Sequence, residues 1–181
     1  GDCICVGWEF ENTGSKRIML RFRPEELSWV PNEAWLRENW RALCFSLVPD
    51  QNFNNSAEFW AWFVGEYYNE ADDVWALPDV VEVYLCPNQD WKKLGDYYYY
   101  TGEPLEAGES GAAVCVCISF KGAEMDNKFQ GAAFKLAGYV EAIQASNNAP
   151  NIAWLGGMDF DEVVWDTVDF DFSNCKDQFG N

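Results

Sequence analysis

The sequence contains no histidine. This absence excludes sites in which histidine is the base beside a serine or cysteine nucleophile, His-Glu-x-x-His zinc proteases, and haem bound through histidine. A phosphate-binding loop is also missing, because the glycine-containing stretch 108–111 lacks the lysine and the length of that motif. The remaining enzymatic alternative is a pair of carboxylates across a sugar-binding cleft, and the sequence does not select two of its thirty Asp and Glu for that role. We therefore predict no catalytic residue, no enzyme activity and no cofactor.

Positive charge is scarce. Twelve Lys and Arg stand against thirty Asp and Glu, which gives a formal net charge of −18 at pH 7. Such a surface repels nucleic acid and anionic membranes, so neither is expected as a partner. Long hydrophobic runs are absent as well, so no membrane insertion is predicted. A chain that starts without methionine or a signal peptide is what we expect of a processed, exported protein.

Seven cysteines are many for a chain of 181 residues. In an exported protein this number predicts disulfides, with one thiol left free or paired between chains. The pairs Cys3/Cys5 and Cys115/Cys117 each share one face of a strand, so two facing pairs would link adjacent strands. A metal cage from these pairs is less favoured, because zinc loops usually use Cys-x-x-Cys. We expect one to three disulfides, with the pairing open, among Cys3, Cys5, Cys44, Cys86, Cys115, Cys117 and Cys175.

The β pattern is densest between residues 81 and 145. Apolar and polar residues alternate at 81–85, 113–120 and 134–144, and four tyrosines follow one another at 97–100. Turn-forming residues interrupt these runs at 93–96 and 103–109. This spacing predicts an all-β fold, specifically a jelly-roll-like β-sandwich.

The N-terminal stretch 1–22 predicts two further strands around a turn at 12–15. The second of these strands carries four of the twelve cations between Lys16 and Arg23. On so acidic a chain, we expect this basic strip to pair with acidic strands of the same chain, and pairing with a neighbouring chain is the alternative.

Two stretches in the middle of the chain interrupt the β pattern. Residues 33–43 predict a short helix capped by Asn32, with Leu36, Trp40 and Leu43 on one stripe, and 44–48 predicts a following strand. Residues 50–79 form an aromatic-rich insertion, in which 57–68 fits a helix or a strand. Its aromatic side chains could stack on sugars or pack against another subunit, and a loop or helix that caps the sandwich is the alternative.

Several motifs resemble the TasA/camelysin group of exported bacterial proteins, whose signal peptides are processed by the signal peptidase SipW. They are Trp91, Gly95 to Tyr100, Pro104-Leu105 with Gly108-Glu109, Val140 to Ala145, the Asn12-Thr13-Gly14-Ser15 turn and Asn147 to Trp154. The resemblance covers most of residues 1–157, with a poorly matching middle. It implies a jelly-roll-like sandwich and a structural role in extracellular biofilm-matrix fibres. The protease activity associated with camelysin is not supported, because the chain has no histidine.

The chain from 158 to 181 forms a C-terminal extension beyond this expected domain at 1–157. Apolar residues alternate with Asp over 164–172, which predicts an amphipathic strand. The apolar residues of this candidate donor or edge strand are Val164, Val168, Phe170 and Phe172.

This extension suggests a mode of assembly. Fibres of the TasA group assemble by donor-strand complementation through a strand that precedes the Gly-Asp with which this chain starts. A sandwich that lacks a strand leaves an open edge. We expect the C-terminal strand to fill it, in cis to give a monomer or in trans to give a head-to-tail homopolymer. The alternative is that this strand simply extends the sheet.

Acidic residues of the extension also suggest a cation site. Asp159, Asp161 and Glu162 lie close in sequence, and carboxylate oxygens suit Ca²⁺. The spacing lacks the pattern of an EF-hand loop, so a solvated acidic face is the preferred interpretation.

These patterns predict a secreted, extracellular or cell-surface structural protein that assembles with itself into a filament or biofilm-matrix fibre. The main rival is a monomeric secreted module that holds carbohydrate or a cell-surface partner through its aromatic insertion. A carboxylate enzyme comes third.

Overall fold

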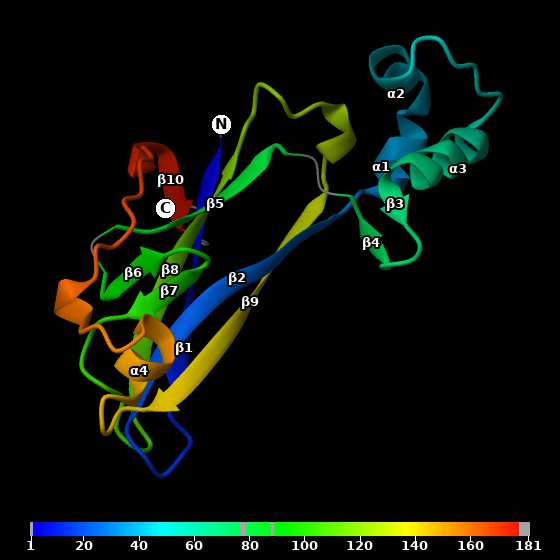
Figure 1. Ribbon diagram of the computed structural model, residues 1–181. Coiled ribbons are helices and arrows are strands. Elements are labelled where there is room, and N and C mark those ends of the chain that lie inside the picture. Colours follow the sequence, from blue (N-terminus) through cyan, green and yellow to red (C-terminus); the bar gives the residue numbers. More distant parts are fainter. Residues whose placement is uncertain (1, 77–78, 88, 178–181) are drawn as a thin grey trace. The chain divides into compact units, whose positions relative to one another are not determined.

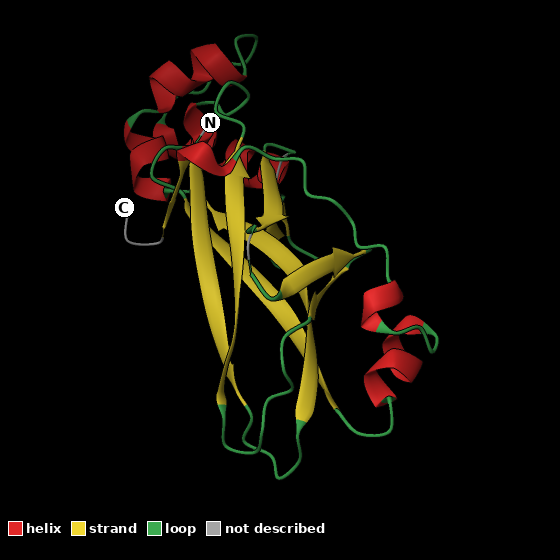
Figure 2. Ribbon diagram, turned by 90° about the vertical axis from the view of Figure 1, so that its left-hand side faces the viewer, coloured by secondary structure: helices red, strands yellow, loops and turns green. Residues whose placement is uncertain are grey.

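The computed structural model of the protein describes residues 2–76, 79–87 and 89–177. The described chain is rich in β-structure, which confirms the coarse fold prediction (Figure 1). It is not all-β, however, because α-helices and short 3₁₀ helices lie between the strands. Figure 2 shows the elements by type, with the strands as the longest of them.

The chain divides into two compact units, and several strands contribute residues to both. The first unit contains residues 26–81 and 120–137. The second contains residues 2–25, 82–119 and the chain from 138 onward. The predicted division at residue 157 is not the division that the structure has, because the C-terminal segment belongs to the same unit as the N-terminal strand.

One four-stranded sheet has the order β10-β1-β8-β5. Its strands are β1 (Cys3–Glu11), β5 (Val81–Leu85), β8 (Ser110–Phe120) and β10 (Cys175–Asp177). β1 runs antiparallel to β8 and parallel to β10. The N-terminal strand therefore lies between a strand from the middle of the sequence and one from its C-terminal end.

The other four-stranded sheet has the order β6-β7-β2-β9. Its strands are β2 (Ile18–Val30), β6 (Trp91–Leu94), β7 (Tyr97–Tyr100) and β9 (Ala133–Gln144). The turn predicted at 93–96 joins β6 to β7, and Gly95 takes a φ of +60° there, which costs a glycine little because it has no Cβ. The predicted strands at 97–100 and 134–144 are also confirmed.

Aromatic side chains from both sheets form the core of the second unit. Phe22 of β2 is 2% exposed and packs against Trp8 of β1, with ring centroids 5.3 Å apart. Phe10 of β1 packs against Trp91 of β6, with centroids 6.0 Å apart. Since these contacts join the two sheets face to face, the arrangement is sandwich-like.

The turn at 12–15 is confirmed, and a buried asparagine organises it. Asn12 is 2% exposed. Its side-chain amide donates to the carbonyls of Lys16, Leu105 and Glu106 at 2.7–3.0 Å, while its Oδ1 accepts from the Gly14 N–H at 3.0 Å. The side chain therefore connects the turn after β1 to the loop before β8.

Helices of the first unit occupy much of the middle of the sequence. They are α1 (Glu33–Glu38), α2 (Trp40–Leu47) and α3 (Ser56–Tyr67), followed by the short hairpin of β3 (Tyr68–Asn69) and β4 (Val74–Trp75). The predicted cap is confirmed, since Asn32 Oδ1 accepts from the Trp35 N–H at 3.1 Å. The strand predicted at 44–48 is wrong, because the backbone stays helical until Val48 N–H donates to the Cys44 carbonyl.

Of the helix and the strand that the sequence allowed for 57–68, the structure has the helix over 57–67. Asn55 caps α3 by accepting from the Glu58 N–H at 3.0 Å. Phe59 and Phe63 lie one turn apart on α3, and both are 0% exposed. Much of the aromatic insertion is therefore core of its own unit, while its residues 77–78 lie outside the described part of the chain.

The C-terminal part begins with α4 (Ala149–Leu155), which Gly156 ends in the left-handed conformation at φ +63°. Two 3₁₀ helices follow, η2 (Phe160–Glu162) and η3 (Phe172–Asn174), and a third, η1 (Asn127–Phe129), lies before β9. The strand predicted over 164–172 is wrong for the single chain, because 164–171 has no regular secondary structure. Residues 178–181 lie outside the described range.

Candidate functional site

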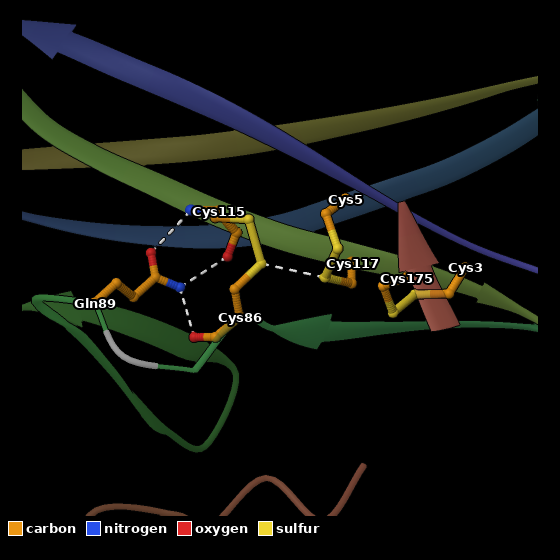
Figure 3. The surroundings of a disulfide bond; sticks show 7 residues. All are labelled: Cys3, Cys5, Cys86, Gln89, Cys115, Cys117 and Cys175. Atoms are coloured by element: carbon orange, nitrogen blue, oxygen red, sulfur yellow. Dashed lines mark hydrogen bonds between the residues drawn. A yellow bond between two sulfur atoms is a disulfide. The ribbon is translucent and has the colours of Figure 1, made fainter. Parts of the chain in front are cut away.

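Six cysteines form three disulfides in the second unit (Figure 3). The pairs are Cys3–Cys175, Cys5–Cys117 and Cys86–Cys115. The prediction of up to three disulfides is confirmed, and the odd thiol belongs to Cys44, whose pKa is raised by burial.

Strand register explains two of these pairs. Cys3 lies opposite Cys175 in the parallel β1/β10 pair, and Cys5 lies opposite Cys117 in the antiparallel β1/β8 pair. Alternation along β1 places both its cysteines on one face, as the sequence predicted. The disulfides therefore cross-link three neighbouring strands of one sheet.

The third disulfide lies where β5 ends. The Cys86 N–H donates to the Cys115 carbonyl at 3.1 Å. The Gln89 side chain then bonds both backbone groups of Cys115, since its Nε2 donates to the carbonyl at 2.9 Å and its Oε1 accepts from the N–H at 2.9 Å. Gln89 thus takes the place of a strand beside β8, a role that no local pattern in the sequence indicates.

The six sulfur atoms lie close together along the sheet (Figure 3). The sulfurs of Cys5, Cys86, Cys115 and Cys117 all lie within 4.8 Å of one another, and Cys86 Sγ is 3.2 Å from Cys117 Sγ. The group includes Cys5 of the first Cys-x-Cys pair and both cysteines of the second, which is the arrangement that the metal-cage alternative requires. In this structure the sulfurs are bonded in pairs, so the disulfide alternative describes them.

Beside the outer face of β7 lies a partly buried arginine of the predicted basic strip. Arg21 of β2 forms an ion pair with Glu141 of β9, and its guanidinium lies 3.9 Å from the Tyr97 ring centroid and 5.1 Å from that of Trp154. Burial alone lowers the pKa of Arg21, but hydrogen bonds to Glu141 and Tyr99 outweigh it and the net shift is upward. Arg21 therefore pairs within the chain, as expected for the strip.

The C-terminal segment covers this face. Tyr99 of β7 forms a cluster with Leu155 at the end of α4 and with Val163 after η2. Trp165 packs against the Tyr99 ring, with centroids 5.7 Å apart. Both faces of β7 are consequently buried, the inner one by Phe22 and the outer one by this segment.

The predicted assembly residues lie in the same segment and are held in cis. The Asp166 N–H donates to the Lys93 carbonyl at 2.8 Å, and the Asp166 carboxylate accepts from the Gly95 N–H at 2.8 Å. Phe170 stacks on Tyr84 of β5 with centroids 4.1 Å apart. The hydrogen bond to Glu82, followed by burial, raises the pKa of Tyr84 to about 12. The backbone of the segment thus binds the β6/β7 turn instead of joining a sheet as a strand.

Exposure along the segment follows the predicted alternation in part. Val168, Phe170 and Phe172 are half-buried, whereas Val164 is 89% exposed. The following strand β10 is fixed to β1 by the disulfide of Cys175. The segment is therefore held at both ends: its first residues pack on β7 and bind the β6/β7 turn, and the disulfide of Cys175 follows its last residues.

One edge of the second sheet is formed by β9, which is twelve residues long (Figure 1). In the sheet order of the described chain, β2 is its neighbour on one side and no strand follows on the other. Tyr139 and Val140 are exposed by 45% and 41%. Sequence periodicity locates this strand, but its edge position depends on the order of strands in the sheet.

The carboxylates proposed for Ca²⁺ have roles in local structure. Asp159 accepts a hydrogen bond from the Asn151 side chain at 2.9 Å, and Glu162 accepts from the Asp159 N–H at 3.2 Å. Together they form a capping box at the start of η2. Asp161 is exposed beside them, and calcium binding stays a prediction.

A cleft of about 230 Å³ lies within the helical unit. Its lining residues come from α2 and the chain after it: Trp40, Arg41, Cys44, Phe45, Pro49, Gln51, Asn52 and Phe53. Phe45 is 84% exposed, which is unusual for a phenylalanine. Trp40 and Phe53 beside it are partly exposed, so the cleft presents three accessible aromatic side chains.

These features define a β-rich, sandwich-like protein whose first sheet is cross-linked by three disulfides. No described helix is long and apolar enough to cross a membrane. No family model, curated protein or solved structure matches the chain. The resemblance to the TasA/camelysin group therefore stays a prediction.

Proposed function

We propose that the protein is a secreted structural subunit of a TasA-like extracellular fibre, with a jelly-roll-like sandwich that accepts an extended segment of the next subunit along β9. The observation that carries the proposal is the long edge strand β9, which has only two charged side chains, Lys135 and Glu141, among its twelve residues. Exposed sheet edges present unpaired backbone groups that another strand can bind, and proteins usually shorten, charge or cover them.

The other terminal strands of the described sheets are less suited to this role. β10 has three residues and β6 has four, two of which are lysines. β5 has five residues and carries the aromatic contact to Phe170. β9 has twelve, and over 138–144 its one charged side chain, Glu141, is paired with Arg21. A strand added there would form backbone hydrogen bonds worth about 0.5–1.5 kcal/mol each.

Addition of a segment from a neighbour is a head-to-tail contact, because donor and acceptor are different surfaces. Such contacts propagate without closing and give filaments. The segment 164–172 serves as a cover in cis, since Asp166 and the Cys3–Cys175 disulfide hold it on its own unit. The net charge of −18 opposes assembly, so fibres should form more readily as salt screens the repulsion.

The extracellular location rests on the disulfides. Three such bonds in one chain are typical of oxidising compartments and rare in the cytosol of mesophiles. Immunoblotting of culture medium and cell fractions under non-reducing conditions tests this part, and a fully reduced intracellular protein would contradict it.

A pair of matched variants tests the assembly. Val140→Lys places a charge on the edge of β9, while Ile152→Lys makes a similar change at a 65% exposed position on α4. Negative-stain electron microscopy should show fibres for the wild type and Ile152→Lys, and single particles for Val140→Lys. Equal fibre formation by both variants would rule out the β9 edge as the acceptor.

The helical cleft supports a second candidate function, carbohydrate binding. Trp40, Phe45 and Phe53 offer faces for stacking on sugar rings, and Arg41 and Gln51 offer hydrogen-bond donors. Glycan titrations followed by tryptophan fluorescence should show saturable quenching that Phe45→Ala weakens and Ile152→Ala leaves unchanged. Quenching that is the same in both variants would contradict binding at this cleft.

A further inference from the structure

The six disulfide-bonded cysteines, which we call the cysteine row, include a close contact between two different disulfides. Cys86 Sγ, which is bonded to Cys115, lies 3.2 Å from Cys117 Sγ, which is bonded to Cys5 (Figure 3). A thiolate that replaced the Cys86–Cys115 bond would therefore already be beside a second disulfide. Thiol–disulfide exchange requires this kind of approach of a thiolate to a disulfide sulfur.

Burial limits the routes to that second disulfide. Cys117 is 1% exposed, whereas Cys86, Cys115 and Cys5 are partly exposed. A thiol from solution can reach the Cys86–Cys115 bond, but the folded sheet shields the Cys117 sulfur from it. The group positioned to attack Cys117 is Cys86 of the same chain.

We propose that Cys86 is the nucleophile of an intramolecular disulfide exchange that transmits attack by an external thiol to Cys5. A low-molecular-weight thiolate attacks Cys115 Sγ, forms a mixed disulfide there and releases the Cys86 thiolate. Cys86 then attacks Cys117 Sγ, forms Cys86–Cys117 and releases the Cys5 thiolate. Two disulfide bonds break and two form, so no net oxidation occurs, and the negative charge moves from the external thiol to Cys5.

The product is a different covalent state of the sheet. The link between β1 and β8 at Cys5 is lost, while β8 stays linked to the end of β5 through Cys86–Cys117. The exchange also leaves the chain with a bound thiol at Cys115 and a partly exposed thiol on β1. This makes the cysteine row a site of modification by thiols, a property independent of fibre assembly.

The most direct test frees Cys86 genetically. In a Cys44→Ser background, Cys115→Ser leaves Cys86 without its partner, and Cys86→Ser is the matched control that leaves Cys115 free. Each folded variant is incubated at pH 8, trapped with iodoacetamide and mapped by mass spectrometry without reduction. Circular dichroism confirms folding before trapping.

The proposal predicts that Cys115→Ser yields a Cys86–Cys117 peptide pair with alkylated Cys5. The control should retain Cys5–Cys117 and be alkylated at Cys115, with exchange at least about tenfold slower, because the 3.2 Å contact to Cys117 is made by the Cys86 sulfur, which this variant lacks. Alkylation of Cys86 alone in Cys115→Ser, or equal exchange in both variants, would overturn the proposal.

A second measurement keeps all six cysteines of the row. The Cys44→Ser protein is treated with limiting glutathione under native conditions and trapped as above. The expected species carries glutathione on Cys115 and the alkyl label on Cys5. A species with glutathione on Cys115 and the label on Cys86 would show that the second step does not occur.

Discussion

Removal of the Cys3–Cys175 disulfide should lower the free energy of unfolding of the second unit by about 4 kcal/mol. This value depends on the length of the loop that the disulfide closes when the Cys5–Cys117 bond is also present. The two cysteines are 172 residues apart in sequence. The Cys5–Cys117 bond shortens the closed path, which runs along β1 from Cys3 to Cys5, across that bond and along the chain to Cys175, about 60 residues in all. In the chain-entropy model of disulfides, a loop of this length corresponds to about 4 kcal/mol, whereas the full separation would give about 5 kcal/mol.

The experiment uses Cys3→Ala/Cys175→Ala in a Cys44→Ser background, with Cys44→Ser alone as the control. Urea denaturation under non-reducing conditions, followed by tryptophan fluorescence, gives the free energy of unfolding. Hydrogen exchange should also show faster exchange of the β10 backbone in the variant. A loss below about 1 kcal/mol, against the typical 2–5 kcal/mol for a native disulfide, would refute the entropy argument and the tethering of the C-terminal segment.

Three further predictions concern packing, pH and hydrogen bonding in the second unit. Gly138→Ala places a Cβ in the space of the buried Phe22 ring and should lower the free energy of unfolding by about 1–3 kcal/mol. In the control Gly7→Ala, the new Cβ has its nearest contact at 3.4 Å, so the free energy of unfolding from urea denaturation should stay within about 1 kcal/mol of wild type. Equal effects of the two substitutions would contradict the packing of β9 on Phe22. Burial raises the pKa of Tyr98 to about 12, so the stability from its neutral form is complete below about pH 10 and is lost as the pH rises through 12. Denaturation between pH 9 and 11.5 should therefore show a smaller loss for Tyr98→Phe than for wild type, and parallel curves would argue against that shift. Asn12→Ala leaves several backbone groups without partners and should cost about 2–4 kcal/mol by the same assay, with a cost under about 0.5 kcal/mol inconsistent with its buried hydrogen bonds.

Local patterns in the sequence predicted the elements whose structure depends on nearby residues. Alternation and turn residues located β1 and β2 with the turn between them, the tyrosine strand β7 and the edge strand β9. The Asn32 side chain indicated the start of α1, and its cap hydrogen bond is present in the structure. These signals depend on periodicity and capping, which a single sequence displays.

Features that depend on contacts distant in sequence were not predicted. Cys86 pairs with Cys115 because β5 ends beside this residue of β8. The spacing of the cysteines in the sequence does not indicate which residues of these two strands lie side by side. The segment 164–172 has a strand-like pattern, yet its apolar side chains pack on Tyr84 and Tyr99 while its backbone lies outside both sheets. An alternating pattern specifies which side chains are buried, but a strand also needs a neighbouring backbone with free hydrogen-bonding groups.

Cryo-electron microscopy of the oxidised protein, purified from culture medium and kept at physiological salt, shows directly whether subunits join along β9. We expect fibres in which an extended segment of one subunit is hydrogen-bonded along β9 of the next, while 164–172 still covers β7 of its own chain. Monodisperse single particles, or fibres in which the outer edge of β9 stays unpaired, would contradict it.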